Sequence, residues 1–175
     1  MEQKELTKNY YNAIAKGYDE LYGEEQKEKL NTIKDYLPEK GDVLDAGSGT
    51  GVSKQFLNKS VNITAIDISE ELLNLNPIEK KIIGDVENMP FEKNQFDHII
   101  CLTVLQDVND KQKAINELSR VLKTNGTLFI SFLKNSKFKD EIINELESKF
   151  KIIHKIEEKI DLIIIAKNTT PYPSS

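Results

Sequence analysis

Residues 43–51 read Val-Leu-Asp-Ala-Gly-Ser-Gly-Thr-Gly, and this stretch decides the fold. Two apolar residues lead into three glycines at alternating positions, Gly47, Gly49 and Gly51, and a short helical pattern follows over residues 53–57. Glycine adopts positive φ and lets a backbone approach a ligand with no Cβ between them. A buried strand, a glycine turn and a helix start, in that order, are typical of a nucleotide-type site in an α/β sheet.

The glycine spacing separates this turn from the dinucleotide fingerprint. That fingerprint is G-x-G-x-x-G, whereas here the run is G-x-G-x-G, with Asp45 two residues before the first glycine. An acid at that position suits a cationic or amino-bearing ligand better than a phosphate. A second acid, Asp67, ends the apolar stretch 63–66, about twenty residues on, where such folds place the acceptor of the ribose hydroxyls. Taken alone, the three glycines could simply form a tight turn between a strand and a helix. The position of Asp67 favours the interpretation as a ligand site.

The same stretch resembles the first signature of the class I S-adenosylmethionine (SAM)-dependent methyltransferases, (V/I)LDxGxGxG. Four later segments match further motifs of that family in order: AIDIS at 65–69, GDVENMPF at 84–91, FDHIIC at 96–101 and LSRVLKTNGTL at 118–128. Several ordered motifs at the right spacing are far more specific than one glycine turn. The resemblance covers nearly the whole chain and is to the small methyltransferase type 11 domains of the ubiquinone- and menaquinone-biosynthesis kind.

This resemblance implies a fold. It implies a Rossmann-like α/β architecture, a doubly wound, mostly parallel sheet of seven strands with an antiparallel last strand. Besides the strand that leads into the glycine turn, apolar runs predict strands over residues 61–67, 81–85, 96–102, 127–133, 152–156 and 162–166. The last two are joined by a short charged turn, so we expect them to form a hairpin.

The resemblance also implies which residues hold the cofactor, SAM. The glycine turn would pass its methionine part, and Asp45 would hold the amino group directly or through water. Asp67 would bind the ribose and Asp85 the adenine amino group, with Ile68 and Val86 on the two faces of the purine. The implied cofactor-binding residues are Tyr18, Asp45, Ala46, Gly47, Gly49, Gly51, Asp67, Ile68, Asp85, Val86 and Leu102.

The N-terminal residues 1–38 are expected to form cap helices, over 6–21 and 24–37. Residues 11–19 resemble the family opening yxxxAxxYD, in which a tyrosine closes over the cofactor. This segment is interpreted either as a lid over the cofactor or as an amphipathic helix that packs on the core. We expect residues 1–168 to form one methyltransferase domain and residues 169–175 to be a loose tail.

Bulk composition narrows the classes of protein. A chain of 175 residues suits one domain, and a net charge of −5 argues against a globally basic nucleic-acid surface. The single cysteine, Cys101, cannot form an internal disulfide, and no metal-ligand cluster surrounds it, so no metal site is expected. No apolar run is long enough to span a membrane and Met1 does not open a signal peptide, so we expect a cytoplasmic protein.

The sequence does not identify the catalytic residue. Relatives often carry histidine near position 106, whereas this chain has Gln106 and Asp107. Asp107 is the nearest candidate for a proton acceptor, against the alternative of a helix-start or loop carboxylate. Glu87 is interpreted as a solvent-facing residue at a helix start, and His98 and His154 as structural residues of strands.

The sequence does not identify the methyl acceptor either, and several hypotheses remain. One hypothesis is a small-molecule methyltransferase whose pocket is roofed by the N-terminal helices. Another is a methyltransferase for a macromolecule, tRNA or protein, that needs a small activator protein. A third is a non-catalytic SAM-binding module. A nicotinamide-dependent oxidoreductase is the alternative that the fold class alone leaves.

Overall fold

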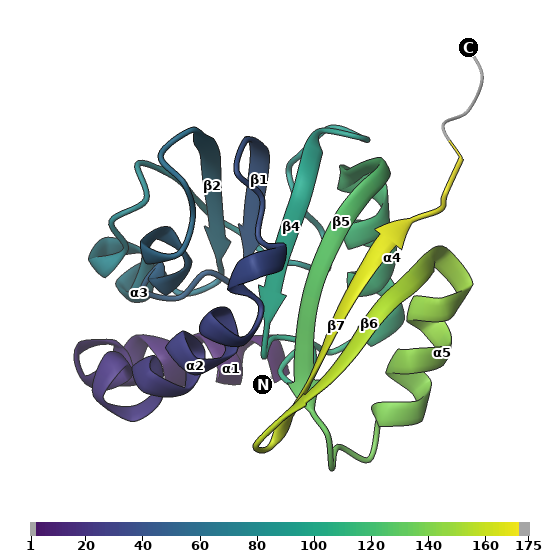
Figure 1. Cartoon of the computed structure of the whole chain (residues 1–175). Coiled ribbons are helices and arrows are strands. Elements are labelled where there is room, and N and C mark those ends of the chain that lie inside the picture. Colours follow the sequence, from purple (N-terminus) through teal and green to yellow (C-terminus); the bar gives the residue numbers. More distant parts are fainter. Residues whose placement is uncertain (1–2, 172–175) are drawn as a thin grey trace.

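The structure, a computed structural model, describes residues 3–171, so the end of the expected tail, residues 172–175, lies outside the described residues. One sheet of seven strands runs through the molecule in the order β3-β2-β1-β4-β5-β7-β6 (Figure 1). The strands are β1 (Gly41–Ala46), β2 (Val61–Asp67), β3 (Lys80–Ile83), β4 (Phe96–Leu102), β5 (Leu122–Leu133), β6 (Phe150–Glu158) and β7 (Asp161–Asn168).

The direction of the strands confirms the expected sheet. Strands β3, β2, β1, β4 and β5 pair in parallel, and β7 pairs antiparallel with both β5 and β6. The central strands are apolar on both sides, as buried parallel strands are, and β1 ends with four consecutive buried residues. The strand order reverses between β1 and β4. In open α/β sheets, ligands bind beyond the carboxyl ends of the strands at such a reversal.

Five α-helices surround the sheet: α1 (Gln3–Ile14), α2 (Glu24–Thr32), α3 (Glu70–Leu75), α4 (Lys111–Val121) and α5 (Lys139–Lys149). The expected helix over 6–21 is wrong in its extent, because α1 gives way to a 3₁₀ turn at Ala15–Gly17 and a π turn at Asp19–Gly23. Each of these turns ends in a glycine, which weakens a helix. The helix expected after the glycine turn is a single 3₁₀ turn, Val52–Gln55.

The helices cover both faces of the sheet. Helices α4 and α5 pack Leu118 and Leu146 against one face, in a core that includes Leu44 and Ile130. Helix α2 packs Leu30 against the other face. Helices α1 and α2 also lie across the end of the sheet to which the arrowheads of β2 and β4 point (Figure 1). The N-terminal segment therefore covers the carboxyl ends of the parallel strands.

A lysine lies wholly inside this arrangement. Lys29 of α2 is 1% exposed, and its Nζ lies 2.9 Å from Asp161 Oδ2 at the start of β7 and 2.9 Å from Glu25 Oε1. Lys29 also donates a hydrogen bond to Thr103 Oγ1, just after β4. Among residues 3–171, Asp161 Oδ1 has no hydrogen-bond partner. Lys29 thus ties the N-terminal cap to two strands of the sheet.

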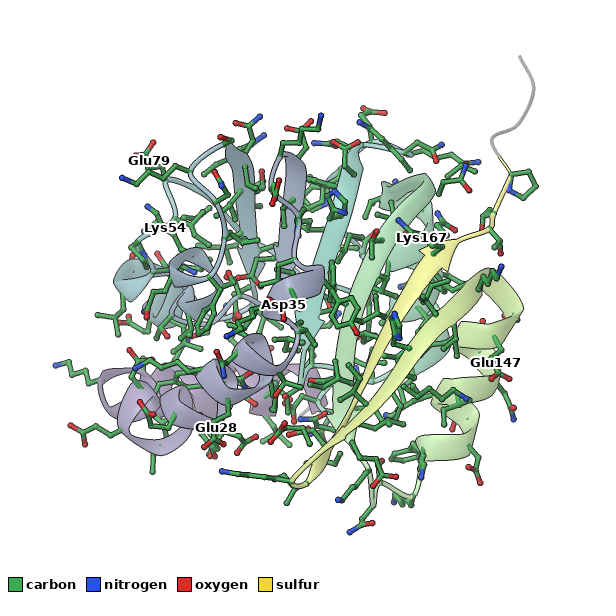
Figure 2. The ribbon with its side chains drawn as sticks, viewed as in Figure 1. Glu28, Asp35, Lys54, Glu79, Glu147 and Lys167 are labelled. Atoms are coloured by element: carbon green, nitrogen blue, oxygen red, sulfur yellow. The ribbon has the colours of Figure 1, made fainter. Side chains whose placement is uncertain are left out.

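The two edge strands carry charged side chains. Lys80 and Lys81 are exposed on β3, and Lys151 and Lys155 are exposed on β6. Lys155 Nζ lies 3.2 Å from Oε1 of Glu147, which Figure 2 labels on α5. Both edges of the sheet thus present charged side chains to solvent, with exposed Glu157 beside the lysines of β6.

Beyond β7 the chain is held where the structure describes it. The Thr169 amide donates to the Lys149 carbonyl over 3.2 Å, and Thr170 Oγ1 lies 2.8 Å from Ser119 Oγ. Within residues 3–171, no helix combines the length and the apolar character needed to cross a membrane.

Candidate active site

A cavity opens beyond the carboxyl ends of β1, β2 and β4, and α1 forms its roof. Its lining is Lys4, Thr7, Tyr11, Tyr18, Gly47, Gly49, Asp67, Ile68, Leu72, Gly84, Asp85, Val86, Glu87, Leu102, Thr103, Val104, Asp107 and Val108. Eight of the eleven candidate residues for the cofactor lie in this lining, together with Asp107.

The glycine turn forms the floor of this cavity. Gly47 and Gly49 have φ of 71° and 52°, in the left-handed region that favours glycine. A Cβ on Gly47 would lie 2.3 Å from Val104 Cγ2, so a side chain there would collide with the loop after β4. The bare main chain of these two residues leaves the floor open to a ligand.

Gly51 and Ala46 do not line this cavity. Ala46 is fully buried at the end of β1. A Cβ on Gly51 would lie 2.2 Å from Asn76 Oδ1, and its φ of 77° is left-handed. Buried Asn76 in turn donates to the Gly49 carbonyl over 3.0 Å. Gly51 is therefore required to be glycine by the packing of Asn76, and its expected part in holding the cofactor stays a prediction.

Asp67, the last residue of β2, holds the glycine turn that follows β1. Its Oδ2 accepts a hydrogen bond from the Gly49 amide and its Oδ1 one from the Ser69 amide, each over 2.8 Å. Burial raises the pKa of this carboxyl above its usual value, and the backbone amides of Ser69, Gly49 and Ile68 partly offset the shift. The side chain is fixed at the rim of the cavity, at the end of β2.

Asp85 and Val86 lie at the end of the cavity beyond β3, with Ile68. Asp85 Oδ1 accepts from the Glu87 amide over 2.9 Å, and Oδ2 forms an ion pair with Lys4 of α1. Glu87 is 5% exposed, and its Oε1 and Oε2 accept from the amides of residues 110 and 109. The interpretation of Glu87 as a solvent-facing residue is wrong, because its carboxylate braces the loop before α4.

Asp45 faces a smaller neighbouring cavity, which Gly47, Tyr18 and Leu102 also line. Its Oδ2 accepts a hydrogen bond from Ser53 Oγ. Burial raises the pKa of Asp45 to about 7; the Ser53 hydrogen bond lowers the pKa and the nearby Asp67 charge raises it. Asp45 therefore lies behind the glycine turn rather than in the main cavity.

Asp107 is in the main cavity, and α1 contacts it. Tyr11 Oη donates to Asp107 Oδ2 over 2.7 Å, and Thr7 Oγ1 donates to the Asp107 carbonyl over 3.4 Å. Burial raises the pKa of Asp107, while the hydrogen bond from Tyr11 and the charge of Lys111 lower it. The Tyr11 and Tyr18 ring centroids are 6.2 Å apart. Both rings and the carboxylate line the cavity.

Sequence reasoning missed several contributors to this site. Lys4 and Thr7 reach the cavity only because α1 folds over the sheet, and no pattern in the sequence marks them. Thr103 has φ of 59°, which is unusual for a β-branched residue and is not readable from its neighbours. Asn76 is a further such residue, because it donates to the Gly49 carbonyl over 3.0 Å. His98 and His154 lie in β4 and β6 and do not line the cavity.

Comparisons with known proteins agree with this geometry. The profile of a family described as a methyltransferase domain matches residues 44–130. The uncharacterized protein MJ0638 of Methanocaldococcus jannaschii is 38% identical over 152 residues, 84% of this chain and 63% of that protein. The demethylmenaquinone methyltransferase of Thermotoga maritima is 31% identical over 135 residues, 69% of this chain and 58% of that protein.

A solved structure shares the fold. The magnesium protoporphyrin IX methyltransferase from Synechocystis PCC 6803, with bound SAM, superposes with a TM-score of 0.77 at 18% identity, over 97% of this chain and 98% of that one. The chain spans less than two thirds of the length of the two relatives above. The profile match includes the glycine turn, Asp67 and Asp85. The chain belongs to the class I SAM-dependent methyltransferase family.

Proposed function

We propose that the chain transfers the methyl group of SAM to a small-molecule acceptor that binds beneath α1. The observation that carries the proposal is the meeting of two acidic strand ends, Asp67 and Asp85, with the bare main chain of Gly47 and Gly49 in one cavity. Such a cavity offers acceptors for a ribose and an adenine along a floor with no side chains.

The residues present fit the nucleoside part of SAM. An ionised carboxylate accepts about four hydrogen bonds, and the backbone amides of Gly49, Ser69 and Ile68 already act on Asp67. The remaining capacity suits a ribose hydroxyl. Asp85 would accept from the adenine amino group in exchange for part of its contact with Lys4, while Ile68 and Val86 pack on the purine. Asp45 would reach the methionine amino group through the cavity behind Gly47.

SAM supplies a methyl carbon that is already electrophilic, because it is attached to a positively charged sulfur. The chain has to hold the acceptor in line behind that carbon and keep water out. Positioning of this kind can contribute roughly 7–11 kcal/mol to lowering a barrier. Helix α1 serves both needs, since it closes the cavity through Tyr11 and Lys4.

The roof is also why we propose a small acceptor. Contacts of Lys4, Thr7 and Tyr11 with Asp85 and Asp107 cover the cavity. A tRNA or protein acceptor would need that roof displaced, and an activator protein could do so. With radiolabelled methyl-SAM, the purified chain and fractionated cell extract, we expect label in the small-molecule fraction. Label only in RNA or protein, or only after another protein is added, would favour the macromolecular alternative.

The cofactor assignment is tested by Asp67→Ala. We expect the affinity for SAM to fall by at least about 1 kcal/mol, or more than fivefold, because charge-assisted hydrogen bonds are lost. Isothermal titration calorimetry measures it, with circular dichroism to confirm folding and Asp35→Ala as control. Asp35 is exposed and remote from the cavity, on the 3₁₀ turn Lys34–Tyr36 (Figure 2). An unchanged affinity in a folded Asp67→Ala protein would refute the assignment. SAM binding without turnover on any extract would instead favour the non-catalytic module.

A further inference from the structure

The charged groups of the main cavity are mostly acidic. Its lining has four carboxylates, Asp67, Asp85, Glu87 and Asp107, and one cationic side chain, Lys4, which is paired with Asp85. The proposed function uses Asp67 and Asp85 for the nucleoside. Both carboxylate oxygens of Glu87 accept backbone amides. Asp107 is the carboxylate that neither the cofactor nor the loops account for.

Asp107 has an oxygen to spare. Its Oδ2 accepts the Tyr11 hydroxyl over 2.7 Å, whereas Oδ1 has no hydrogen-bond partner among residues 3–171. The Tyr11 hydrogen bond fixes the side chain of Asp107 without neutralising its charge. A fixed carboxylate with a vacant acceptor position, inside a cavity, is suited to a ligand that donates hydrogen bonds and carries positive charge.

Two aromatic rings flank this carboxylate. Tyr11 and Tyr18 line the same cavity with their centroids 6.2 Å apart, and a second ring pair, Tyr18 and Tyr22, extends the cluster at 5.3 Å. Tyrosine faces attract cations within about 6 Å of the ring centroid. The rings therefore reinforce the preference for a cation that the Asp107 charge creates.

Other classes of acceptor fit less well. A carboxylate or phosphate would be repelled by Asp107, because Lys4 is paired with Asp85 and Lys111, whose charge acts on Asp107, does not line the cavity. A hydroxyl acceptor must lose its proton to become a good nucleophile, and no histidine lines the cavity among the described residues. An amine needs less help, since its neutral form is already nucleophilic.

We infer that the methyl acceptor is a small amine, bound as its ammonium form by Asp107 and the Tyr11 and Tyr18 rings and methylated on nitrogen. This inference rests on the proposed function. The ammonium gives a proton to Asp107, and the nitrogen lone pair then forms a bond to the methyl carbon. The carbon–sulfur bond breaks, and its electron pair stays on sulfur as a thioether. Asp107 then releases its proton to solvent.

The test identifies the methylated atom. The purified chain is incubated with SAM carrying a ¹³C-methyl group and with a small-molecule extract, and the product is analysed by NMR and mass spectrometry. An N-methyl amine is the expected result. A methyl group on oxygen, sulfur or carbon would overturn the inference while supporting the proposed function. Absence of any labelled product, with SAM bound, would contradict both.

A variant locates the acceptor within the cavity. Asp107→Asn retains the shape of the side chain and can still accept from Tyr11, but it lacks the negative charge. With the labelled product as readout, we expect kcat/KM for the amine to fall at least tenfold while the Kd for SAM changes less than twofold. Asp35→Asn is the control for overall charge. A change below twofold in kcat/KM for Asp107→Asn would overturn the role of Asp107.

Discussion

At the scale of single residues, Gly51 and Gly17 differ in what would surround a Cβ. At Gly51 it would lie 2.2 Å from Asn76 Oδ1 with φ at 77°, whereas at Gly17 nothing lies within 4 Å. We expect Gly51→Ala to lower the free energy of unfolding by about 2–4 kcal/mol, from a left-handed alanine and an overpacked contact. Urea denaturation followed by circular dichroism measures it.

Gly17→Ala is the matched control. Gly17 ends the 3₁₀ turn Ala15–Gly17 and has no positive φ. Alanine there reduces the entropy of the unfolded chain, so stability should stay within about 1 kcal/mol or rise. If both variants lost equal stability, the close packing of Gly51 against Asn76 would be contradicted.

Asp45 makes stability depend on pH. Burial raises its pKa to about 7 from 3.8, so the folded chain holds this proton more tightly than the unfolded chain. Its effect is to lower the free energy of unfolding as pH rises from about 4 to about 7. Asp45→Asn removes this loss. We expect the variant to gain on the wild type by up to about 4 kcal/mol between pH 4 and pH 8.

Thermal or urea unfolding at several pH values, without SAM, tests this expectation. Asp35→Asn, at an exposed position, is the control for a lost surface charge. A difference between Asp45→Asn and the wild type that does not change with pH would show that the Asp45 carboxyl titrates as it does in the unfolded chain.

At the scale of elements, α1 is held by polar contacts. None of its residues is buried, and Asn12 Oδ1 accepts from Ser69 Oγ over 2.7 Å. We expect Asn12→Ala to speed amide hydrogen exchange in α1 severalfold, because one hydrogen bond contributes about 1 kcal/mol. The free energy of global unfolding should change by less than about 1 kcal/mol, since local opening does not expose the core.

Asn9→Ala provides the comparison on the same helix, because Asn9 is exposed. Hydrogen exchange followed by mass spectrometry resolves α1 from the sheet. Equal exchange rates for the two variants would contradict the role of Asn12 as a fastening of the roof.

The extent of α1 shows where sequence reasoning succeeds and where it stops. Apolar and aromatic residues at helical spacing indicated a helix at the N-terminus, and one is present. The helix is interrupted by the 3₁₀ turn that ends at Gly17 and the π turn that ends at Gly23. Helix propensity alone does not predict where such turns occur. Ser69, of a residue type that commonly caps helices, accepts from the Leu72 amide over 3.2 Å at the start of α3. Local signals were sufficient for the strands.

At the scale of the whole molecule, the ion pair of Lys29 with Asp161 connects α2, near the N-terminus, to β7, near the C-terminus. The side chains of Lys29 and Asp161 are 1% and 2% exposed. Lys29→Met would leave Asp161 as a buried unpaired charge, so we expect a loss of about 3–5 kcal/mol in the free energy of unfolding. The double variant Lys29→Met with Asp161→Asn should recover part of that loss.

Lys159→Met is the matched control, because Lys159 pairs with Glu28 at the surface, Nζ to Oε2 2.6 Å. Its melting temperature should stay close to that of the wild type. Urea unfolding of the wild type, the two single variants and the double variant measures these changes in stability. Equal losses for Lys29→Met and Lys159→Met would show that burial does not govern the Lys29 pair.

The pair also marks a limit of prediction. The positions of the strands along the chain were predictable, because the family motifs and the apolar runs mark them. Asp67 and Asp85 were predictable as residues of one site, because Asp67 ends β2 and Asp85 follows the end of the parallel strand β3 by two residues. The contact of Lys29 with Asp161 and Thr103 was not, since it depends on how α2 lies across β7, and no local pattern encodes that. The same holds for Lys4 at Asp85 and for Tyr11 at Asp107.

The charged edges of the sheet have a consequence for the behaviour of the chain in concentrated solution. An unpaired edge strand is a template on which a second copy can extend the sheet. Lys80 and Lys81 on β3 would bring like charges together in any such stacking, and on β6 the exposed Lys151, Lys155 and Glu157 would carry their charges into it. These charged side chains therefore oppose fibril growth at the two strands where main-chain hydrogen bonding would otherwise invite it.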